Sequence, residues 1–138
     1  MNGPRELRVR AEVDKLDTVL SFIDEELESA GCPLKVQMQI DVAAEEIFVN
    51  IAHYAYGPEG GDAIIGLSVN GESSEAVISF TDSGIEFDPL AKQDPDVTLA
   101  AEERQIGGLG IYMVKKSMDQ VTYKRDAGRN ILMIRKTW

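Results

Sequence analysis

The sequence predicts an α+β fold, a two-layer α/β sandwich in which helices cover one face of a mixed, mostly antiparallel sheet. Three stretches carry apolar residues every three or four positions, which is the period of a helix with one buried side. Shorter stretches alternate apolar and polar residues, as half-buried strands do, and turn sequences join two pairs of them into hairpins. Because the order is β-α-α-β-β-α-β-β, the helices are expected to pack together against the sheet.

The predicted elements can be placed along the chain from these two periods. Residues from about 90 to 106 keep neither period, and so long a loop inside a compact domain is often a lid. The acidic run 24–28 is expected to face solvent, with Leu27 alone turned inward. The length of 138 residues suits one domain over residues 1–138. The predicted strands are 7–13, 65–69, 76–80, 121–125 and 131–135, and the predicted helices are 16–30, 33–55 and one that starts at 107–110.

The composition is that of an ordinary globular protein, with 43% hydrophobic and 28% charged residues. The formal net charge of −10 argues against a nucleic acid held by phosphate contacts and against an anionic membrane surface. An acidic surface serves solubility and also suits a basic protein partner. Cys32 is the single cysteine, so we expect neither a disulfide within the chain nor a cysteine metal site. With no signal-peptide pattern and no apolar run near the ~20 residues of a membrane span, a cytoplasmic location is expected.

Two polar residues stand beside the apolar stripe of the second predicted helix. Glu46 and Asn50 are four residues apart, so they lie on one face of that helix. A carboxylate there can orient or deprotonate a hydroxyl group near a phosphate. The Asn carbonyl oxygen suits Mg²⁺, which takes few ligands from the protein and keeps waters and phosphate oxygens. The same pair occurs by chance in many helices, so alone it does not establish a site.

Asp82-Ser83-Gly84 follows the strand predicted at 76–80. An Asp at the end of a strand with a Gly two residues later is a common turn. The same residues also suit a binding site, in which the Asp82 carboxylate accepts a hydrogen bond from an exocyclic amine such as that of adenine. Gly84 would then let the chain approach the base closely. The residues alone leave both interpretations open.

Gly107-Gly108-Leu109-Gly110 leads into the third predicted helix. Glycines before a helix let backbone N–H groups converge on an anion, and the helix dipole favours negative charge there. The segment lacks the GxGxxG spacing after a strand and the Lys of a P-loop, so neither of those nucleotide-binding folds is indicated. Phosphate binding and a flexible hinge both remain open.

Taken together and in this order, the three motifs resemble those of the Bergerat-fold ATP-binding domains. Residues 45–50 are similar to the N-box of that superfamily, residues 82–84 to its first glycine box and residues 107–110 to its second. The resemblance covers roughly residues 7–136. The chain length, the short lid, the Phe87-Asp88-Pro89 run and the ending at 128–132 look most like the stand-alone anti-sigma factor serine/threonine kinases.

The resemblance implies an ATP site and assigns roles to its residues. It implies that Asn50 is a ligand of Mg²⁺, that Glu46 is the catalytic base, and that Asp82 reads adenine with Gly84 beside it. The backbone amides implied at the phosphates are those of Gly107, Gly108, Leu109 and Gly110.

The chain also departs from the family pattern. The family often has His where Tyr54 stands, and the chain's one histidine, His53, comes one place earlier. His53 would contact phosphate or lie partly exposed at the helix end. Arg104, in the predicted lid, is a candidate for holding phosphates and otherwise a solvated charge. Near the end, Arg129-Asn130 stands where the family often has Thr after the hairpin Gly.

The function implied by the resemblance is that of a cytoplasmic protein kinase. It would transfer the γ-phosphoryl group of Mg·ATP to a Ser or Thr of an anti-sigma factor antagonist (STAS) protein, and its nucleotide state would decide whether it holds the antagonist or a sigma factor. The resemblance also suggests a homodimer. The alternative is a non-catalytic module of the same fold that binds its partner according to its ATP state, and the missing family histidine motivates it. The ATPase half of a histidine kinase is disfavoured because dimerisation helices with a substrate histidine are lacking.

Overall fold

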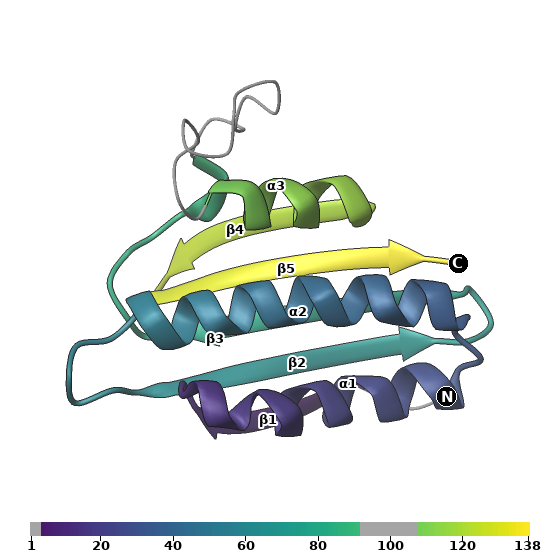
Figure 1. Ribbon diagram of the computed structural model, residues 1–138, viewed down its shortest axis with the longest axis horizontal. Helices are drawn as coiled ribbons and strands as arrows, with labels where there is room; N and C mark the ends of the chain where they lie inside the picture. The colour runs from purple at the N-terminus through teal and green to yellow at the C-terminus, as the bar shows by residue number, and fades with distance from the viewer. Residues whose placement is uncertain (1–3, 92–107) are drawn as a thin grey trace.

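The sandwich predicted from the sequence is the architecture of this protein. The computed structural model describes residues 4–91 and 108–138. Within them, five strands form one sheet in the order β1-β2-β3-β5-β4, and the three helices lie together on one face of it (Figure 1). All four strand pairings are antiparallel. The predicted fold class is therefore confirmed, and the described sheet is antiparallel throughout instead of mixed.

The elements agree with the predicted ones except at their ends. The strands are β1 (Arg5–Arg10), β2 (Asp62–Asn70), β3 (Glu75–Asp82), β4 (Gln120–Asp126) and β5 (Arg129–Thr137), and the helices are α1 (Leu16–Ser29), α2 (Leu34–Tyr54) and α3 (Gly108–Ser117). β1 stops three residues before its predicted end. There the Ala11 amide donates to the Gly61 carbonyl at 2.8 Å, and the chain then turns through a 3-10 segment, Val13–Lys15. Residues 92–106 of the predicted lid lie outside the described residues.

The hydrophobic core fills the space between the helices and the sheet. Each helix turns its periodic apolar side chains inward, and alternate side chains of the central strands meet them. Its largest fully buried members include Ile23 and Leu27 of α1, Ile40, Ile47 and Phe48 of α2, and Ile65, Ile78 and Phe80 of the sheet. In the described part of the chain, no helix is both long and apolar enough to cross a bilayer.

The acidic run of α1 contains an exception to the predicted exposure. Glu26 is buried, with 8% of its surface exposed, although Leu27 alone was expected to turn inward. The helical period places Glu26 next to the buried side of α1, and the Arg5 guanidinium of β1 forms an ion pair with its carboxylate. Arg5 also lies over the Phe22 ring, 5.5 Å from its centre. The burial of this acid thus depends on a partner from another element.

The predicted motifs lie at one end of the sandwich. β3 ends there at Asp82, β5 begins there, and the two strands pair Asp82 with Asn130. The C-terminal end of α2 and the first turn of α3 lie at the same end (Figure 1). Side chains that are distant in sequence can therefore meet around one pocket.

Candidate functional site

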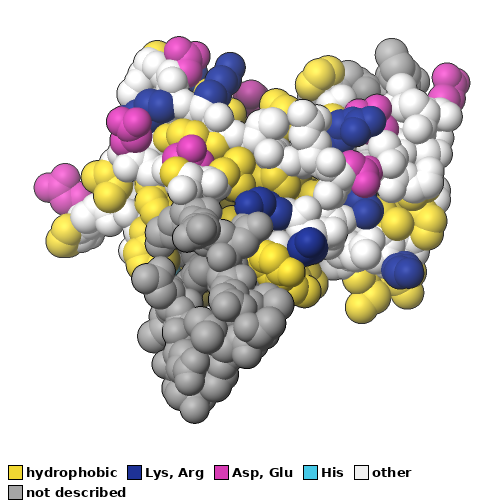
Figure 2. All heavy atoms as spheres, turned by 90° about the horizontal axis from the view of Figure 1, so that it is seen from above, with side chains coloured by type: hydrophobic (Ala, Val, Ile, Leu, Met, Phe, Trp, Pro, Cys, Tyr) yellow, Lys and Arg dark blue, Asp and Glu magenta, His cyan; other side chains and the backbone are white. Residues whose placement is uncertain are grey.

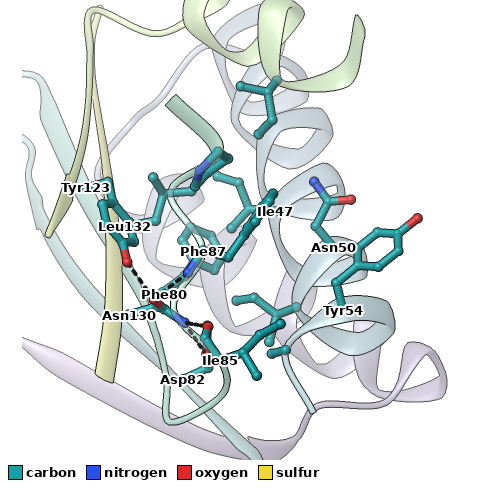
Figure 3. Close-up of a pocket in the computed structure, with 14 residues that line it drawn as sticks. Ile47, Asn50, Tyr54, Phe80, Asp82, Ile85, Phe87, Tyr123, Asn130 and Leu132 are labelled. Carbon is teal, nitrogen blue, oxygen red and sulfur yellow. Dashed lines mark hydrogen bonds between the residues drawn. The ribbon is translucent and has the colours of Figure 1, made fainter. Parts of the chain in front are cut away.

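A pocket opens at this end, between α2, the strand ends and the loop after β3. Its walls are mainly apolar, and Asn50, Asp82, Tyr123 and Asn130 add polar groups. Asn50 and Tyr54 project from α2 on one side, and Asp82 and Asn130 lie on the other (Figure 3). The apolar residues that line it are Ile47, Ile51, Ala55, Phe80, Ile85, Phe87, Pro89, Ile111 and Leu132. An apolar cavity with a few convergent polar groups is the usual form of a small-molecule site.

Asp82 is the buried acid of the pocket, with 6% of its surface exposed. Its Oδ1 accepts hydrogen bonds from the Gly84 amide and from Asn130 Nδ2, both at 2.9 Å. None of the described residues donates a hydrogen bond to Oδ2. Because Oδ1 is fixed by two donors, Oδ2 is held in place as an acceptor for an amine of a ligand.

Gly84 allows the loop after β3 to press against the end of α2. A Cβ at this position would collide with the Ala55 carbonyl. The next residue, Ile85, donates its amide to that same carbonyl at 3.0 Å. The glycine was expected to permit a close approach of backbone to a base, but the close approach in the structure is to the end of α2. Its role towards a ligand stays a prediction.

Asn130 is the polar centre of the pocket, and sequence reasoning did not assign it to the site. Its Nδ2 donates to Asp82 and, at 2.7 Å, to the Ile85 carbonyl. Its Oδ1 accepts from three donors, the Phe87 amide at 3.2 Å, the Tyr123 hydroxyl at 2.6 Å and Arg125 Nη1 at 3.1 Å. With 6% of its surface exposed, Asn130 joins β3, β4, β5 and the loop. The sequence feature that could have pointed to Asn130 is its position directly after the hairpin Gly128-Arg129.

Tyr56 supports the loop from the other side. Its hydroxyl donates to the Asp62 carbonyl at 2.6 Å and accepts from the Ser83 amide at 2.8 Å. Burial is the main cause that raises the pKa of this phenol. Tyr56 was also missed from the sequence, because its partners belong to β2 and to the loop after β3.

Glu46 and Asn50 stand together on α2, as their spacing predicted. Asn50 Nδ2 donates to Glu46 Oε1 at 3.2 Å, and both side chains are half-buried. The first turn of α3 lies directly against this pair, since a Cβ on Gly110 would collide with the Glu46 carboxylate. The structure therefore brings the first and third predicted motifs into contact, while Asn50 also lines the pocket that contains the second.

The structure describes only some of the remaining predicted site residues. α3 begins at Gly108, so a helix start is confirmed at the glycine-rich segment, whereas Gly107 and Arg104 lie outside the described residues. His53 is exposed, in agreement with one of its two predicted alternatives, and its ring meets that of Tyr54 edge to face at 5.9 Å. Tyr54, not His53, is the residue that lines the pocket.

The donor set around Asn50 limits the kind of metal that fits. Among the described residues, no three His, Cys, Asp or Glu side chains are grouped to form a metal site. A single amide oxygen next to one carboxylate does fit Mg²⁺ that arrives with a nucleotide, because such an ion keeps its water and phosphate ligands.

Comparisons with known proteins bear on the family and the fold of this chain. A profile of the histidine kinase-like ATPase domain matches residues 9–136. The serine/threonine-protein kinase BtrW of Bordetella bronchiseptica is 26% identical over 100 residues, which cover 72% of this chain and 70% of that protein. The serine-protein kinase RsbW of Listeria monocytogenes is 28% identical over 109 residues, which cover 75% and 68%. RsbW of Halalkalibacterium halodurans is 32% identical over 93 residues, which cover 64% and 56%.

Solved structures share the fold. The RsbU and RsbW domains of a Mycobacterium tuberculosis protein match with a TM-score of 0.69 at 15% identity, over 99% of this chain and 32% of that one. A chain of the SiaB–SiaC complex from Pseudomonas aeruginosa matches with a TM-score of 0.62 at 18% identity, over 97% of this chain and 89% of that one. At these identities the likeness concerns the fold alone, and it extends over nearly the whole chain.

Proposed function

This chain belongs to the histidine kinase-like ATPase domain family, and on that premise we propose that it is an ATP-dependent serine/threonine kinase. Its substrate is an anti-sigma factor antagonist (STAS) protein, and it regulates a sigma factor by partner switching. The family match confirms the resemblance expected from the motifs. The names of the relatives, serine- and serine/threonine-protein kinases, support the activity. The cytoplasmic location and a homodimer belong to the same proposal and rest on the resemblance.

The Asp82 pocket is the observation that carries the proposal. The apolar walls suit the faces of a purine ring, and the fixed Oδ2 of Asp82 suits the exocyclic amine of adenine. A carboxylate that accepts from this amine discriminates against a base with a carbonyl in its place, since two acceptors would then face each other. The pocket is thus proposed to select ATP by its base.

The triphosphate lies along the line from the pocket to the first turn of α3 in this proposal. Gly108, Leu109 and Gly110 lie in the first turn of α3, where N–H groups have no acceptor within the helix and favour an anion. Gly107 and Arg104 belong to the same phosphate-binding set. Mg²⁺, when bound with the nucleotide, would offset phosphate charge, with Asn50 as its protein ligand.

Glu46 acts as the base in this proposal. It accepts the proton of the substrate hydroxyl while the hydroxyl oxygen bonds to the γ-phosphorus and the bond to the β-phosphate oxygen breaks, which leaves ADP. The hydrogen bond from Asn50 keeps the Glu46 carboxylate oriented on α2. Phosphoryl transfer relies mostly on positioning and electrostatics, so one base and one metal ligand suffice.

Calorimetry with two nucleotides tests the pocket. Wild-type protein is expected to bind ATP and to bind inosine triphosphate, which carries a carbonyl in place of the amine, far more weakly. Asp82→Asn should remove this preference because the amide offers a donor as well as an acceptor. Equal affinity of the wild type for both nucleotides, or unchanged ATP affinity in Asp82→Asn, would refute the adenine assignment.

A non-catalytic, ATP-dependent binding module is the second candidate. The observation in its favour is Tyr54, which lines the pocket at the position where the family often has His. Incubation with ATP and a purified STAS protein from the same organism separates the two candidates. Phosphotransfer that Glu46→Gln abolishes supports the kinase, and tight ATP binding without transfer supports the module.

A further inference from the structure

α2 exposes a second apolar stripe, on the side opposite the core. Leu34, Met38 and Val42 follow one another at successive turns and are 69%, 59% and 66% exposed. The core side of α2 consists of other residues, which are buried against α1 and the sheet. Exposed single apolar residues need no explanation, but a stripe with helical period indicates a surface that is covered in use.

The stripe borders a groove between α2 and α3. These helices lie side by side and run in opposite directions (Figure 1). The side of the molecule formed by α3 and β4 shows hydrophobic side chains at the surface, with basic and acidic ones among them (Figure 2). Met113 of α3 adds a side chain that is 53% exposed. The groove is lined by Met38, Gln39, Val42, Ala43, Glu45, Glu46, Gly110, Met113, Val114 and Ser117.

The groove is continuous with the proposed transfer site. Glu46 and Gly110, which line its inner end, are the residues in contact where the base meets the first turn of α3. A protein substrate must bring its hydroxyl within hydrogen-bond distance of the base. The apolar surface that leads to Glu46 is therefore placed to hold the flanking part of that substrate. Met38 and Met113 are flexible and polarizable, which suits the varied shape of a partner surface.

The charged residues at the two ends of the groove indicate which kind of partner segment fits it. Glu45 is exposed beside Glu46 at the inner end of the groove, whereas Lys116 is exposed in the last turn of α3, towards the opposite end. A complementary segment carries a basic residue near its phosphorylated hydroxyl and an acidic residue about two turns away. A second copy of this chain is a poorer occupant, since it would cover Glu46 and close the transfer site.

We propose that this groove is the docking surface for the STAS protein, which lays an apolar segment with a basic residue near the phosphorylated hydroxyl between α2 and α3. The inference rests on the proposed function and locates its protein substrate. The groove measures about 12 Å along α2 from Met38 to Glu46, so it accommodates about two turns of a docked helix.

The test places a charge in the groove without touching the ATP site. Met38→Asp and Val42→Asp are the variants, and Val13→Asp is the matched control, because Val13 is also exposed (46%) but does not line the groove. The probe is a purified STAS protein from the same organism. Both groove variants are expected to weaken its binding, and to raise its KM for phosphotransfer, about tenfold or more. ATP affinity, kcat and the unfolding temperature should match those of the control.

The outcomes separate docking from catalysis. If the wild type binds the STAS protein without phosphorylating it, the kinase proposal fails, while a weaker affinity of the groove variants still supports docking. Unchanged affinity in both variants, or no binding by the wild type, overturns the docking proposal. If the wild type is a dimer and Met38→Asp makes it a monomer with unchanged STAS affinity, the groove is the contact with a second copy. That result overturns the docking proposal as well.

Discussion

At the scale of single residues, Asn130 determines where Asp82 stands. Its amide spans the end of β3, the following loop and β4, and each of its polar atoms is engaged. Removal of such a buried side chain leaves its partners without hydrogen bonds. Asp82 would then lose one of the two donors that fix Oδ1. Nucleotide affinity should therefore respond to Asn130 even if Asn130 never contacts the nucleotide.

Asn130→Ala is expected to lower the free energy of unfolding by about 1–3 kcal/mol, because it leaves Tyr123 and Asp82 each short of a partner. ATP affinity should fall about tenfold or more, measured by calorimetry at a temperature at which the variant is folded. Arg129→Ala, at the exposed neighbouring position, is the control and should leave both quantities unchanged. A folded Asn130→Ala variant with wild-type ATP affinity would show that Asp82 needs no such support.

At the scale of elements, the loop after β3 is attached to the end of α2 at Gly84. Gly84→Ala places a Cβ against the backbone carbonyl of Ala55, which cannot rotate away as a side chain would. We expect a loss of about 1–3 kcal/mol in the free energy of unfolding, measured in urea. Gly57→Ala is the matched control, since nothing lies within 4 Å of its added Cβ. Equal stability of the two variants would mean that the loop shifts freely from α2.

The contact between α1 and α2 contains a pair of acids, Asp24 of α1 and Asp41 of α2. Oδ1 of Asp24 and Oδ1 of Asp41 are both buried without a hydrogen-bond partner among the described residues. Burial, the neighbouring Asp24 carboxyl and the charge of Glu28 raise the pKa of Asp41 to about 8. The folded protein therefore keeps a proton that the unfolded chain releases near its ordinary pKa of 3.8. Asp41 thus contributes stability that is complete below pH 3.8 and is lost as the pH rises through about 8.

Asp41→Asn should remove this dependence. Between about pH 5 and about pH 8, the free energy of unfolding of the variant is expected to fall less than that of the wild type, so the variant gains relative stability as the pH rises. Urea titrations at constant ionic strength measure the two profiles. Asp17→Asn, on the exposed side of α1, should keep the wild-type slope. Parallel profiles for wild type and Asp41→Asn would contradict a raised pKa.

At the scale of the whole molecule, local patterns in the sequence predicted the helices and strands. The order of the strands in the sheet, which those patterns do not report, determines which residues meet in the pocket. The proximity of Glu46 and Asn50 was predictable because both lie on one helix, four residues apart. Asn130 was not found because it meets Asp82 across 48 positions, through the pairing of β3 with β5. That pairing is non-local, so no period or turn in the sequence reports it. Glu26 was misjudged for the same reason, since its partner Arg5 comes from β1.

Ligand binding should stabilise the whole molecule, because a nucleotide that joins α2, β3 and α3 binds only the folded state. At 100 times its dissociation constant, Mg·ATP is expected to add about 2.7 kcal/mol to the free energy of unfolding. Chelation of Mg²⁺ by EDTA should reduce this gain, because phosphate charge is then not offset near Glu46. In Asn50→Ala the gain in EDTA should equal the gain in Mg²⁺, whereas Glu25→Ala, on the exposed side of α1, should retain the difference. An Asn50→Ala variant that still responds to Mg²⁺ as the wild type does would remove Asn50 from the metal site.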